Sequence, residues 1–377
     1  MLAIAANTFD KPSETFIRAH VSHIAPGQTV LICQEDGGAA QFGCPVLSDI
    51  DPLSRPQRPG ERVKKELRQL WRSNVDPALG GHDEVRVRGF LQRHGVTAVL
   101  AEYGPTGARL RRACKSSGIP LFVHFHGSDA TKRARSPRWR RHYRRLFRDS
   151  TGIIVPSKFL ASRLRDLKCP EDKLHVNPNG IDPSQFSETQ RIPGRVVAIG
   201  RLVEKKAPHL TIRAFAKVFR KRPDATLVMI GDGALRKRCE AEIALHGLEG
   251  IVEMLGVRGP EEVKQVLEEA EVFAQHSVTG ADGDMESFGV SLVEAMASSV
   301  PVVTTNHNGF RETISDGETG LLVEEHDVDG MAEAMLSLLN DPARAEAMGR
   351  AGRARVEAHF THAHTAARLR EIMRLTS

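Results

Sequence analysis

The stretch Asp282–Val303, DGDMESFGVSLVEAMASSVPVV, is the most informative part of this sequence for its fold and its chemistry. Its segment Gly289–Ser298 has the composition of a helix, with Ser287 as a suitable N-cap. Glu286 comes just before this helix and Glu294 about two turns into it. The apolar run at the end of the stretch is typical of a buried strand. The stretch therefore predicts an α/β unit in which a helix leads into a strand.

The first turn of this helix is a candidate ligand site. Phe288, Gly289 and Val290 would offer backbone N–H groups without partners inside the helix, at the positive end of its dipole. Such a terminus suits an anion such as a diphosphate, and Glu286 and Glu294 can accept hydrogen bonds from sugar hydroxyls. Two acids at this spacing also occur on ordinary solvated helices, so this segment alone leaves both interpretations open.

Short apolar runs alternate with amphipathic segments along the whole chain, which predicts buried parallel strands joined by helices. In the front half the runs are Leu2–Ala6, Val30–Gln34, Ala98–Glu102, Leu121–Phe125 and Gly152–Val155. In the back half they are Arg195–Gly200, Thr226–Gly231, Ile251–Leu255, Val272–Gln275 and Val300–Thr305. We therefore expect an α/β protein with two Rossmann-like, doubly wound domains that face each other across a ligand-binding cleft.

The polar, proline-bounded segment Pro183–Gly194 is the expected boundary between these domains. Residues 1–183 would form the first domain and residues 195–360 the second. Residues 361–377 would form a final helix that packs back on the first domain. The charge supports two units, because residues 1–190 hold 30 Lys and Arg against 19 Asp and Glu, whereas the remainder holds 23 against 28.

Composition excludes several classes of protein. Hydrophobic residues make up 40% and charged residues 27% of the 377 residues, which is ordinary globular usage. No apolar run approaches the roughly 20 residues of a membrane span, and the N-terminus does not resemble a signal peptide. Five scattered cysteines argue against a disulfide framework and favour a reducing, cytoplasmic location.

Two further elements of the back half suit phosphate binding. Arg201 and Lys206 follow the strand that ends at Gly200, where an arginine fork and a lysine point charge can hold a phosphate pair. Gly231 opens a tight Gly-Asp-Gly turn after the next strand. Taken singly, a solvated basic loop and an ordinary turn explain these residues equally well.

The order of these back-half motifs resembles that of the retaining glycosyltransferases of family 4, which have the GT-B fold. The motifs are Gly200-Arg201 with Lys206, Gly231-Asp232-Gly233, Leu255-Gly256-Val257, Glu286 with Glu294, and Pro301-Val302-Val303. The resemblance implies that Arg201 and Lys206 neutralise the donor diphosphate, that Glu286 faces the transferred sugar, and that Glu294 holds the ribose hydroxyls. It also implies donor contacts at Ser287, Phe288, Gly289, Val290, Gly231 and Val257.

Front-half segments at the predicted strand ends resemble the subgroup of family 4 that builds bacterial exopolysaccharides, colanic acid among them. They are Pro12–Ile17, Ala101–Gly107, His124–Asp129 and Asn177–Asp182. His126 matches the family histidine beside the donor sugar, although a lone histidine is more often structural. The resemblance places the acceptor near Glu14, Thr15, Tyr103, Gly104 and Asp129.

The segment Lys132–Arg148 holds nine Lys and Arg residues, and its aromatic residues Trp139, Tyr143 and Phe147 recur every four residues on one helical face. Together with Arg140 and Arg144, these residues are candidates for contact with an anionic membrane surface. The alternative is that the aromatic residues pack on the sheet and the arginines are solvated. No motif supports nucleic-acid binding.

Metal signatures are weak in this sequence. Asp282-Gly283-Asp284 and Asp327-Val328-Asp329 both spell the DxD motif of another glycosyltransferase fold, and its occurrence twice in one acidic half shows how common it is. His359, His362 and His364 lie close together near the last predicted helix. We expect no metal and no bound cofactor, since the GT-B fold generally uses cationic side chains and helix dipoles in their place.

The sequence thus predicts a retaining glycosyltransferase that moves a sugar from a nucleotide-diphosphate sugar, with UDP or GDP favoured, to a hydroxyl of a glycan or lipid-linked acceptor. Its expected setting is bacterial envelope or exopolysaccharide synthesis, in the cytoplasm, with or without peripheral contact at the inner face of the membrane. Two alternatives stay open: a sugar-nucleotide epimerase of the same fold, and a non-catalytic nucleotide-sugar-binding protein.

Overall fold

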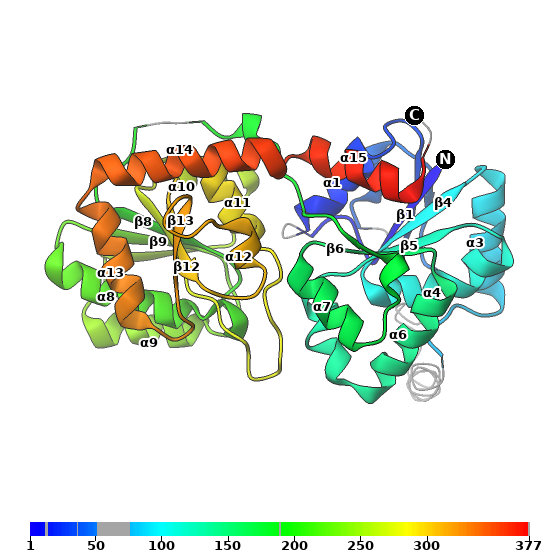
Figure 1. The fold of residues 1–377 in the computed structure, drawn as a ribbon, viewed down its shortest axis with the longest axis horizontal. Helices are drawn as coiled ribbons and strands as arrows, with labels where there is room; N and C mark the ends of the chain where they lie inside the picture. Colours follow the sequence, from blue (N-terminus) through cyan, green and yellow to red (C-terminus); the bar gives the residue numbers. More distant parts are fainter. Residues whose placement is uncertain (12–13, 36, 51–75, 188–189, 376–377) are drawn as a thin grey trace, which may run out of the picture. The chain divides into compact units, whose positions relative to one another are not determined.

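The computed structural model describes residues 1–11, 14–35, 37–50, 76–187 and 190–375 (Figure 1). The chain divides into two compact units, which are considered separately. Unit 1 comprises Met1–Pro178 and His362–Ser377, and unit 2 comprises Asn179–Thr361. Part of the Pro12–Ile17 motif, Pro12 and Ser13, lies outside the described residues.

The sheet of unit 1 is parallel throughout, with strand order β3-β2-β1-β4-β5-β6-β7. The strands are β1 Leu2–Ala6, β2 Thr29–Cys33, β3 Val46–Leu47, β4 Ala98–Glu102, β5 Leu121–His124, β6 Gly152–Val155 and β7 Leu174–Val176. All five predicted front-half runs form strands, and β1, β2, β4, β5 and β6 are buried along their whole length. The strands β3 and β7, at the two edges, were not predicted.

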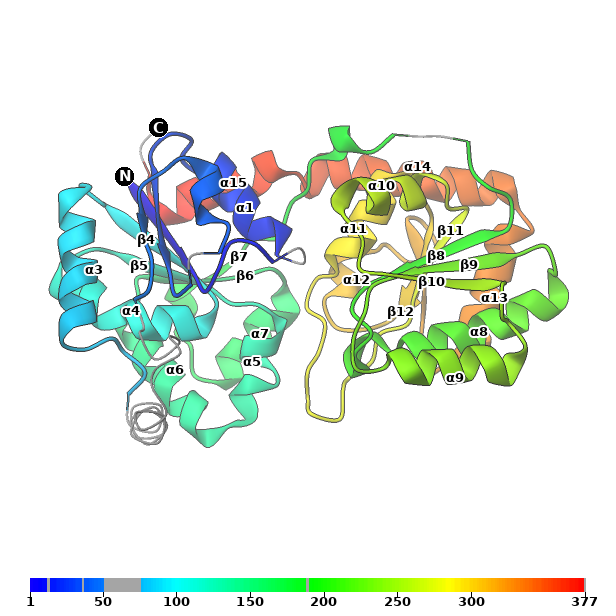
Figure 2. The ribbon, with the colours of Figure 1, turned by 180° about the vertical axis from the view of Figure 1, so that it is seen from behind.

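Helices cover both faces of this sheet (Figure 2). The helices α3 His82–Arg93, α4 Gly104–Ser116, α6 Pro137–Asp149 and α7 Lys158–Asp166 contribute to one core cluster. The helices α1 Thr15–His23 and α15 His362–Met373 contribute to the other, where Ile17 of α1 and Leu369 of α15 are buried. The short helix α5 Gly127–Ala130 and the 3-10 turn η3 Arg133–Arg135 connect β5 to α6.

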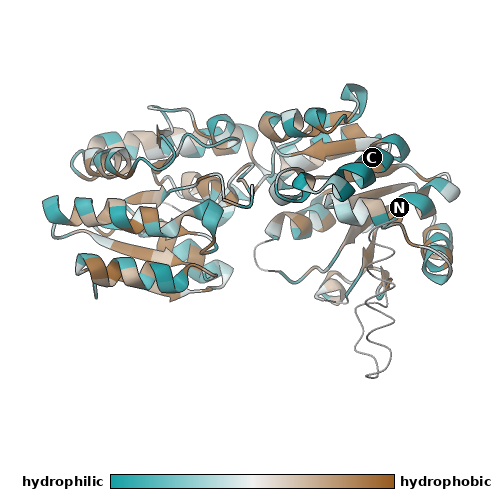
Figure 3. Ribbon diagram, turned by 90° about the horizontal axis from the view of Figure 1, so that it is seen from below, coloured by the Kyte–Doolittle hydropathy of each residue, from teal (hydrophilic) through white to brown (hydrophobic). Residues whose placement is uncertain are grey.

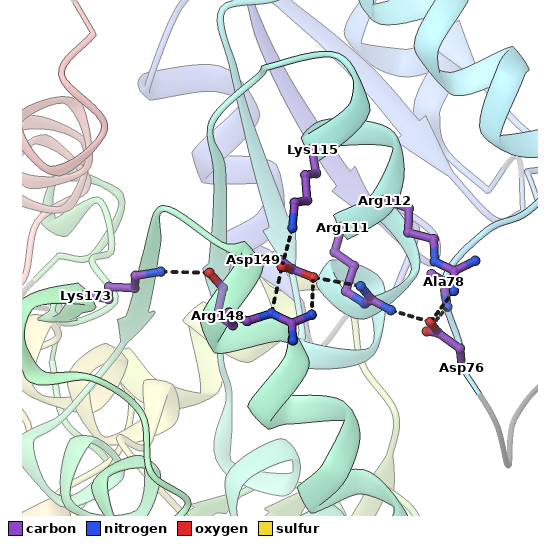
Figure 4. A network of polar contacts seen from close by, with 8 residues as sticks. All are labelled: Asp76, Ala78, Arg111, Arg112, Lys115, Arg148, Asp149 and Lys173. Carbon is purple, nitrogen blue, oxygen red and sulfur yellow. Dashed lines mark hydrogen bonds and ion pairs between the residues drawn. The ribbon is translucent and has the colours of Figure 1, made fainter.

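Polar contacts tie α4 to the C-terminal end of α6 (Figure 4). The Asp149 carboxylate accepts hydrogen bonds from Arg111 at 2.8 Å and from Lys115 and Arg148 at 3.1 Å each. Burial alone would raise the pKa of Asp149, but these three cations outweigh it and lower the pKa to about 2. Arg148 is therefore a structural member of the basic segment, paired within unit 1.

The aromatic stripe of α6 faces the protein core. Tyr143 and Phe147 are buried with at most 1% of their surface exposed, and Trp139 packs against the same cluster. The interpretation of Tyr143 and Phe147 as membrane-surface residues is therefore wrong, since a side chain that fills the core cannot enter a lipid headgroup layer. The alternative, in which the aromatic residues pack under the sheet, describes them correctly.

The sheet of unit 2 is also parallel, with strand order β10-β9-β8-β11-β12-β13. The strands are β8 Arg195–Ile199, β9 Thr226–Ile230, β10 Val252–Gly256, β11 Val272–Gln275, β12 Val302–Thr305 and β13 Gly320–Val323. The edge strand β13 was not predicted. Figure 3 shows the apolar strands of each unit between helices whose outer faces are hydrophilic.

The helices of unit 2 also form two layers. On one face lie α8 Pro208–Lys221, α9 Arg236–His246 and α13 Val328–Leu339, which share a core cluster with the sheet. On the other face lie α10 Pro260–Glu268, α11 Val290–Ala297 and α12 Phe310–Thr313, which share a second core cluster. Helix α14 Pro342–His359 contributes to both clusters, with its N-terminal part to the first and its C-terminal part to the second. Among the described residues, no helix combines the length and hydropathy needed to cross a bilayer.

The boundary of the units differs from the predicted one. The polar segment that begins at Pro183 is attached to unit 2, because the Arg353 guanidinium of α14 donates to the carbonyl oxygens of Pro183 at 3.4 Å and Phe186 at 2.9 Å. Unit 2 therefore starts at Asn179, before the predicted linker. The final helix α15 belongs to unit 1, where the Asn177 amide donates to the carbonyl of Thr365.

Candidate functional site

The centre of the unit 2 site is a carboxylate held by two lysines. Lys205 and Lys206 lie in the 3-10 turn η6 Glu204–Lys206, which follows β8. Lys205 Nζ lies 3.2 Å from Glu286 Oε1, and Lys206 Nζ lies 3.5 Å from Glu286 Oε2. Lys205 also lies 3.3 Å from Asp284. The structure thus joins the predicted residues Lys206 and Glu286 and adds Lys205, which the sequence analysis did not single out.

Burial and charge oppose each other in this cluster. Burial alone would raise the pKa of Glu286, but the ammonium groups of Lys206 and Lys205 outweigh it and lower the pKa to about 2. Burial also lowers the pKa of Lys206, whereas for Lys205 the carboxylates of Glu286 and Asp284 outweigh burial and raise it. Glu286 is therefore a carboxylate at neutral pH, able to accept hydrogen bonds but not to donate a proton.

Gln275 connects this cluster to helix α11. Lys206 Nζ donates to the Gln275 side-chain oxygen at 3.2 Å when the amide is oriented to satisfy its neighbours, and the amide nitrogen then donates to Ser291 Oγ and to the carbonyl of Ile199. Burial raises the pKa of Glu294, on the same helix, to about 7, a rise that Lys206 partly offsets. Glu294 therefore changes its charge near neutral pH.

The N-terminus of α11 differs in detail from the prediction. Its N-cap is Gly289, with φ at +81°, and not Ser287, which is buried. A Cβ atom at Gly289 would come within 2.7 Å of Phe310 and 2.9 Å of Leu292, so both the left-handed backbone and the packing require glycine. Glu294 is the fifth residue of α11, just over one turn in rather than two.

Three of the remaining donor-side residues follow the ends of the neighbouring strands β8, β9 and β10. Gly231 follows β9 with φ at +132°, and a Cβ there would lie 2.0 Å from the Gly200 carbonyl oxygen, so the turn needs glycine. Arg201 is exposed directly after Gly200, and Val257 is 64% exposed just after β10. Phe288 is buried in the core of unit 2, so only its backbone is available to a ligand.

A histidine that sequence reasoning missed holds the backbone of Glu286. The Glu286 N–H donates to His307 Nε2 at 3.1 Å, and His307 Nδ1 lies 2.5 Å from Glu325. This arrangement puts the proton on Nδ1, where Glu325 accepts it, and leaves Nε2 as the acceptor. The signal in the sequence was weak, because these three residues are spread over about forty positions and no motif joins them.

The candidate metal motifs have other contacts. Asp284 pairs with Lys205, Asp327 caps helix α13 by accepting from the Gly330 N–H, and Asp329 pairs with Lys217. His362 begins α15. These contacts give the aspartates structural roles in unit 2.

Unit 1 holds a second buried carboxylate, Glu102, the last residue of β4. Glu102 lies 2.7 Å from His20 Nδ1, 3.1 Å from His126 Nε2 and 3.4 Å from His124 Nδ1. The predicted site residue His126 therefore contacts a carboxylate that the sequence analysis did not assign. An acid at the end of an otherwise apolar strand was the available signal, since a buried carboxylate needs partners.

The charges of this histidine cluster follow from burial. Burial alone would raise the pKa of Glu102, but the histidines, first His20, outweigh it and lower the pKa well below its ordinary value. Burial, assisted by His126, lowers the pKa of His124 to about 4, so His124 is neutral at pH 7. Donor atoms of His20, Glu102 and His124 lie within 4.8 Å of one another, a spacing compatible with a metal ion.

The predicted acceptor-side residues gather beside this cluster. The Tyr103 hydroxyl donates to Glu14 at 2.9 Å, and the Gly104 N–H donates to the buried Asp129 carboxylate at 2.9 Å. Thr15 is the first residue of α1. Tyr103 has φ at +72°, a strained conformation for a non-glycine residue and one that concentrates at functional sites.

Comparison with known proteins assigns the chain to a family. The family model described as "Glycosyltransferase Family 4" matches residues 28–185, and the one described as "Glycosyl transferases group 1" matches residues 184–355. The protein of Escherichia coli named for colanic acid biosynthesis, WcaL, is 35% identical over 76% of this chain and 74% of its own length. The amylovoran biosynthesis glycosyltransferase AmsK of Erwinia amylovora is 32% identical over 73% of this chain and 69% of its own.

A further relative agrees with this family, and a solved structure shows the same fold. A GDP-mannose-dependent phosphatidylinositol monomannoside mannosyltransferase of Mycolicibacterium smegmatis is 32% identical over 84% of this chain and 81% of its own length. The crystal structure of Anabaena HepE, in complex with UDP and glucose, has the same fold, with a TM-score of 0.79 at 17% identity and full coverage of both chains. This chain therefore belongs to glycosyltransferase family 4 and has the two-domain GT-B fold of that family.

Proposed function

We propose that this glycosyltransferase moves a sugar from a nucleotide-diphosphate sugar to an acceptor hydroxyl, with retention of configuration at the anomeric carbon, in the synthesis of a bacterial exopolysaccharide. The observation that carries the proposal is the pairing of Lys205 and Lys206 with Glu286 at the end of β8. The names of WcaL and AmsK favour exopolysaccharide synthesis. HepE with UDP and the GDP-mannose-dependent relative favour a UDP- or GDP-sugar.

The chemical problem is the departure of a diphosphate from the sugar. Lys206 and the exposed Arg201 supply positive charge after β8, and the first turn of α11 supplies backbone N–H groups. Charge that is already in position stabilises the developing diphosphate without reorganisation, which is electrostatic catalysis. We propose that these cations make a metal unnecessary for the transfer.

Glu286 and Glu294 have different proposed tasks. Glu286 is ionised and fixed by two lysines, so it accepts hydrogen bonds from hydroxyls of the transferred sugar. Glu294, whose pKa is about 7, accepts hydrogen bonds from the ribose diol in its ionised form. No residue is assigned as a nucleophile, and the leaving phosphate takes the proton of the acceptor hydroxyl. For His126 we keep the proposed contact with the sugar.

The acceptor is proposed to bind unit 1, through the residues around Tyr103, Glu14 and Asp129. We propose a cytoplasmic location. Membrane contact, where it occurs, would use the arginines of α6, because the aromatic residues Tyr143 and Phe147 are buried.

The test uses the purified full chain with a panel of UDP-, GDP- and ADP-sugars, with and without a membrane lipid extract. The proposal is supported if nucleotide release depends on the extract and the sugar has the same anomeric configuration in the product as in the donor. Isomerised donor without any acceptor would instead identify an epimerase. Tight nucleotide binding without turnover on any donor or extract would identify a binding protein.

A matched pair of variants tests the site. Glu286→Gln should keep nucleotide binding and lower turnover, whereas Glu318→Gln, at an exposed position of unit 2, should change neither. Equal turnover in the two variants would remove Glu286 from the site.

A further inference from the structure

A basic pocket of about 340 Å³ lies in unit 1 and is lined by residues of α6 and of the end of α7. Its cationic lining residues are Arg135, Arg140, Arg144, Arg163 and Lys168. Among the described residues one carboxylate, Asp166, lines the pocket, and Ala130, Thr131, Ala134 and Leu167 complete the walls. Figures 1 and 2 show α6 and α7 next to each other in unit 1. Five cations facing one acid make this pocket strongly positive.

This concentration of charge is not explained by the stability of the fold. Like charges that share a small volume repel one another, so the cluster costs folding free energy. In the part of the chain that the structure describes, Asp166 forms an ion pair with one of these five cations, Arg163, at 3.6 Å. The Nε atom of Arg163 is buried and has no hydrogen-bond partner among the described residues. The pocket therefore holds at least one buried guanidinium N–H, that of Arg163, whose hydrogen-bonding capacity the described residues do not satisfy.

Neighbouring arginines of the same two helices behave differently. Arg148 of α6 pairs with Asp149 (Figure 4), and Arg165 of α7 forms two hydrogen bonds with Glu171, at 2.6 and 2.7 Å. Asp149 and Glu171 thus partner arginines outside the pocket. Inside it, Arg140 is oriented by a 2.7 Å bond from its Nε to the carbonyl of Ala134, which leaves its terminal nitrogens for other partners.

We propose that this pocket binds a phosphate or diphosphate group of a ligand other than the sugar donor. Guanidinium groups bind phosphate oxygens in a bidentate fork, and several together match a dianion or trianion. The volume exceeds that of a single ordered water by an order of magnitude, so a diphosphate fits. Donor binding is assigned to Arg201 and Lys206 of unit 2, so the two sites share no residue.

The place of the pocket along the chain indicates which ligand it serves. Its lining residues Ala130 and Thr131 directly follow Asp129, which is bonded to the Gly104 N–H among the proposed acceptor-side residues. A phosphate bound here therefore belongs to a molecule that reaches the acceptor side of unit 1. This last step rests on the proposed function, whereas phosphate binding itself does not.

The first experiment titrates the full chain with inorganic pyrophosphate by calorimetry, in an Arg201→Ala background that weakens the donor site. The pocket variant combines Arg144→Ala with Arg163→Ala. The control combines Arg141→Ala with Arg165→Ala, which removes one arginine from each of the same helices outside the pocket. The pocket variant should bind pyrophosphate at least about tenfold more weakly, since charged hydrogen bonds are lost, and the control within about threefold of its parent.

Equal pyrophosphate affinity in the pocket variant and the control overturns the proposal. If the double variant fails to fold, Arg144→Ala alone, at an exposed position, repeats the comparison against Arg141→Ala. If the pocket variant loses pyrophosphate binding but its donor binding equals that of its parent, the pocket is a site separate from the donor site. If Arg201→Ala leaves donor binding unchanged, the proposed role of Arg201 in donor binding is wrong, and the pocket proposal is not affected.

A second arm distinguishes the source of the phosphate. Vesicles of phosphatidylcholine with phosphatidic acid are compared with vesicles of phosphatidylcholine alone in a flotation assay. Binding to the acidic vesicles that the pocket variant loses and the control keeps assigns the site to a lipid phosphate. Weakened pyrophosphate binding with unchanged flotation assigns it to a phosphate of a water-soluble ligand. Both effects should diminish as salt screens the charges.

Discussion

Glu102 of unit 1 and Glu286 of unit 2 are both largely buried carboxylates near strand ends of a parallel sheet, but their partners differ. Three histidines surround Glu102, whereas two lysines hold Glu286. Lysine keeps its charge over the physiological range of pH, and histidine does not. The difference teaches that the carboxylate of unit 2 is paired with side chains that stay charged, while unit 1 holds a cluster whose charge depends on pH.

The largest expected effect comes from removing the carboxylate of unit 1. Glu102→Gln should destabilise unit 1 by about 3–5 kcal/mol, because it breaks a buried charge network and leaves histidines without their acceptor. Hydrogen exchange of peptides from β4 and β5 measures the loss within unit 1 alone. Glu35→Gln, at an exposed position of the same unit, is the control and should change little. Similar exchange rates in both variants would mean that the network contributes no stability.

Acid should affect unit 1 through His124, whose pKa is about 4 in the folded protein against about 6.5 in the unfolded chain. Between these values the unfolded state binds the proton and the folded state does not. Stability is therefore lost as the pH falls from about 6.5 to about 4, by about 3 kcal/mol in all. Urea unfolding at a series of pH values, monitored by hydrogen exchange of peptides from unit 1, measures how the free energy of unfolding depends on pH.

The matched variants His124→Asn and His276→Asn separate the two units in this respect. His276, just after β11 in unit 2, also has a pKa lowered to about 4 by burial. Each substitution should reduce the pH dependence of the free energy of unfolding of its own unit and leave the pH dependence of the other unit unchanged. A slope that persists in unit 1 of the His124→Asn variant would assign the acid sensitivity to another group.

In unit 2 the lysines should matter for turnover more than for folding. Lys206→Ala should lower kcat/KM for the sugar donor by about 10²-fold, since it removes a preorganised cation from the site of charge development. Lys237→Ala, exposed on α9, serves as the control. The proposed role of Lys206 is ruled out by a change smaller than threefold in steady-state assays.

The smallest expected effect concerns Glu294, whose pKa is about 7. If its carboxylate accepts hydrogen bonds from the ribose, nucleotide affinity should rise about tenfold between pH 6 and pH 8, as the ionised fraction grows. Calorimetric titration of UDP and GDP at several pH values measures this change. Glu294→Gln should bind nucleotide more weakly and without this rise; a rise that survives in the variant points to another titrating group.

The alternation of apolar runs was sufficient to predict ten strands, and nine of them are interior strands, which are mostly apolar because both of their faces are covered. The tenth, the edge strand β10, was predicted as well, although its Glu253 is exposed. The edge strands β3, β7 and β13 escaped prediction. β3 has two residues, and β7 has three with a histidine in the middle, so neither carries a long apolar signal. The apolar run of β13, Gly-Leu-Leu-Val, was present in the sequence and was overlooked. The N-cap of α11 was misplaced because Gly289 is selected by its left-handed φ and by Phe310, a contact that sequence spacing does not reveal.

The candidate site shows the same limit. Motifs led to Arg201, Lys206 and His126, which follow strand ends, and to Glu286, which lies just before helix α11. Lys205 was missed because two adjacent lysines look equivalent until the backbone turns one of them toward Asp284. Glu102 and His20 are 82 positions apart, and only the packing of α1 against the sheet brings them together. Partners chosen by tertiary packing leave little trace in a single sequence.

The helix α15 has a consequence for the order in which the protein acquires its structure. Leu369 and Met373 fill the core against α1, and the Arg370 guanidinium donates to the carbonyls of His23 and Ile24, nearly 350 positions earlier. During synthesis, unit 2 has all of its residues before unit 1 does. The part of α1 that α15 covers therefore stays exposed until α15 has been synthesised, and apolar surface left uncovered in that interval favours aggregation.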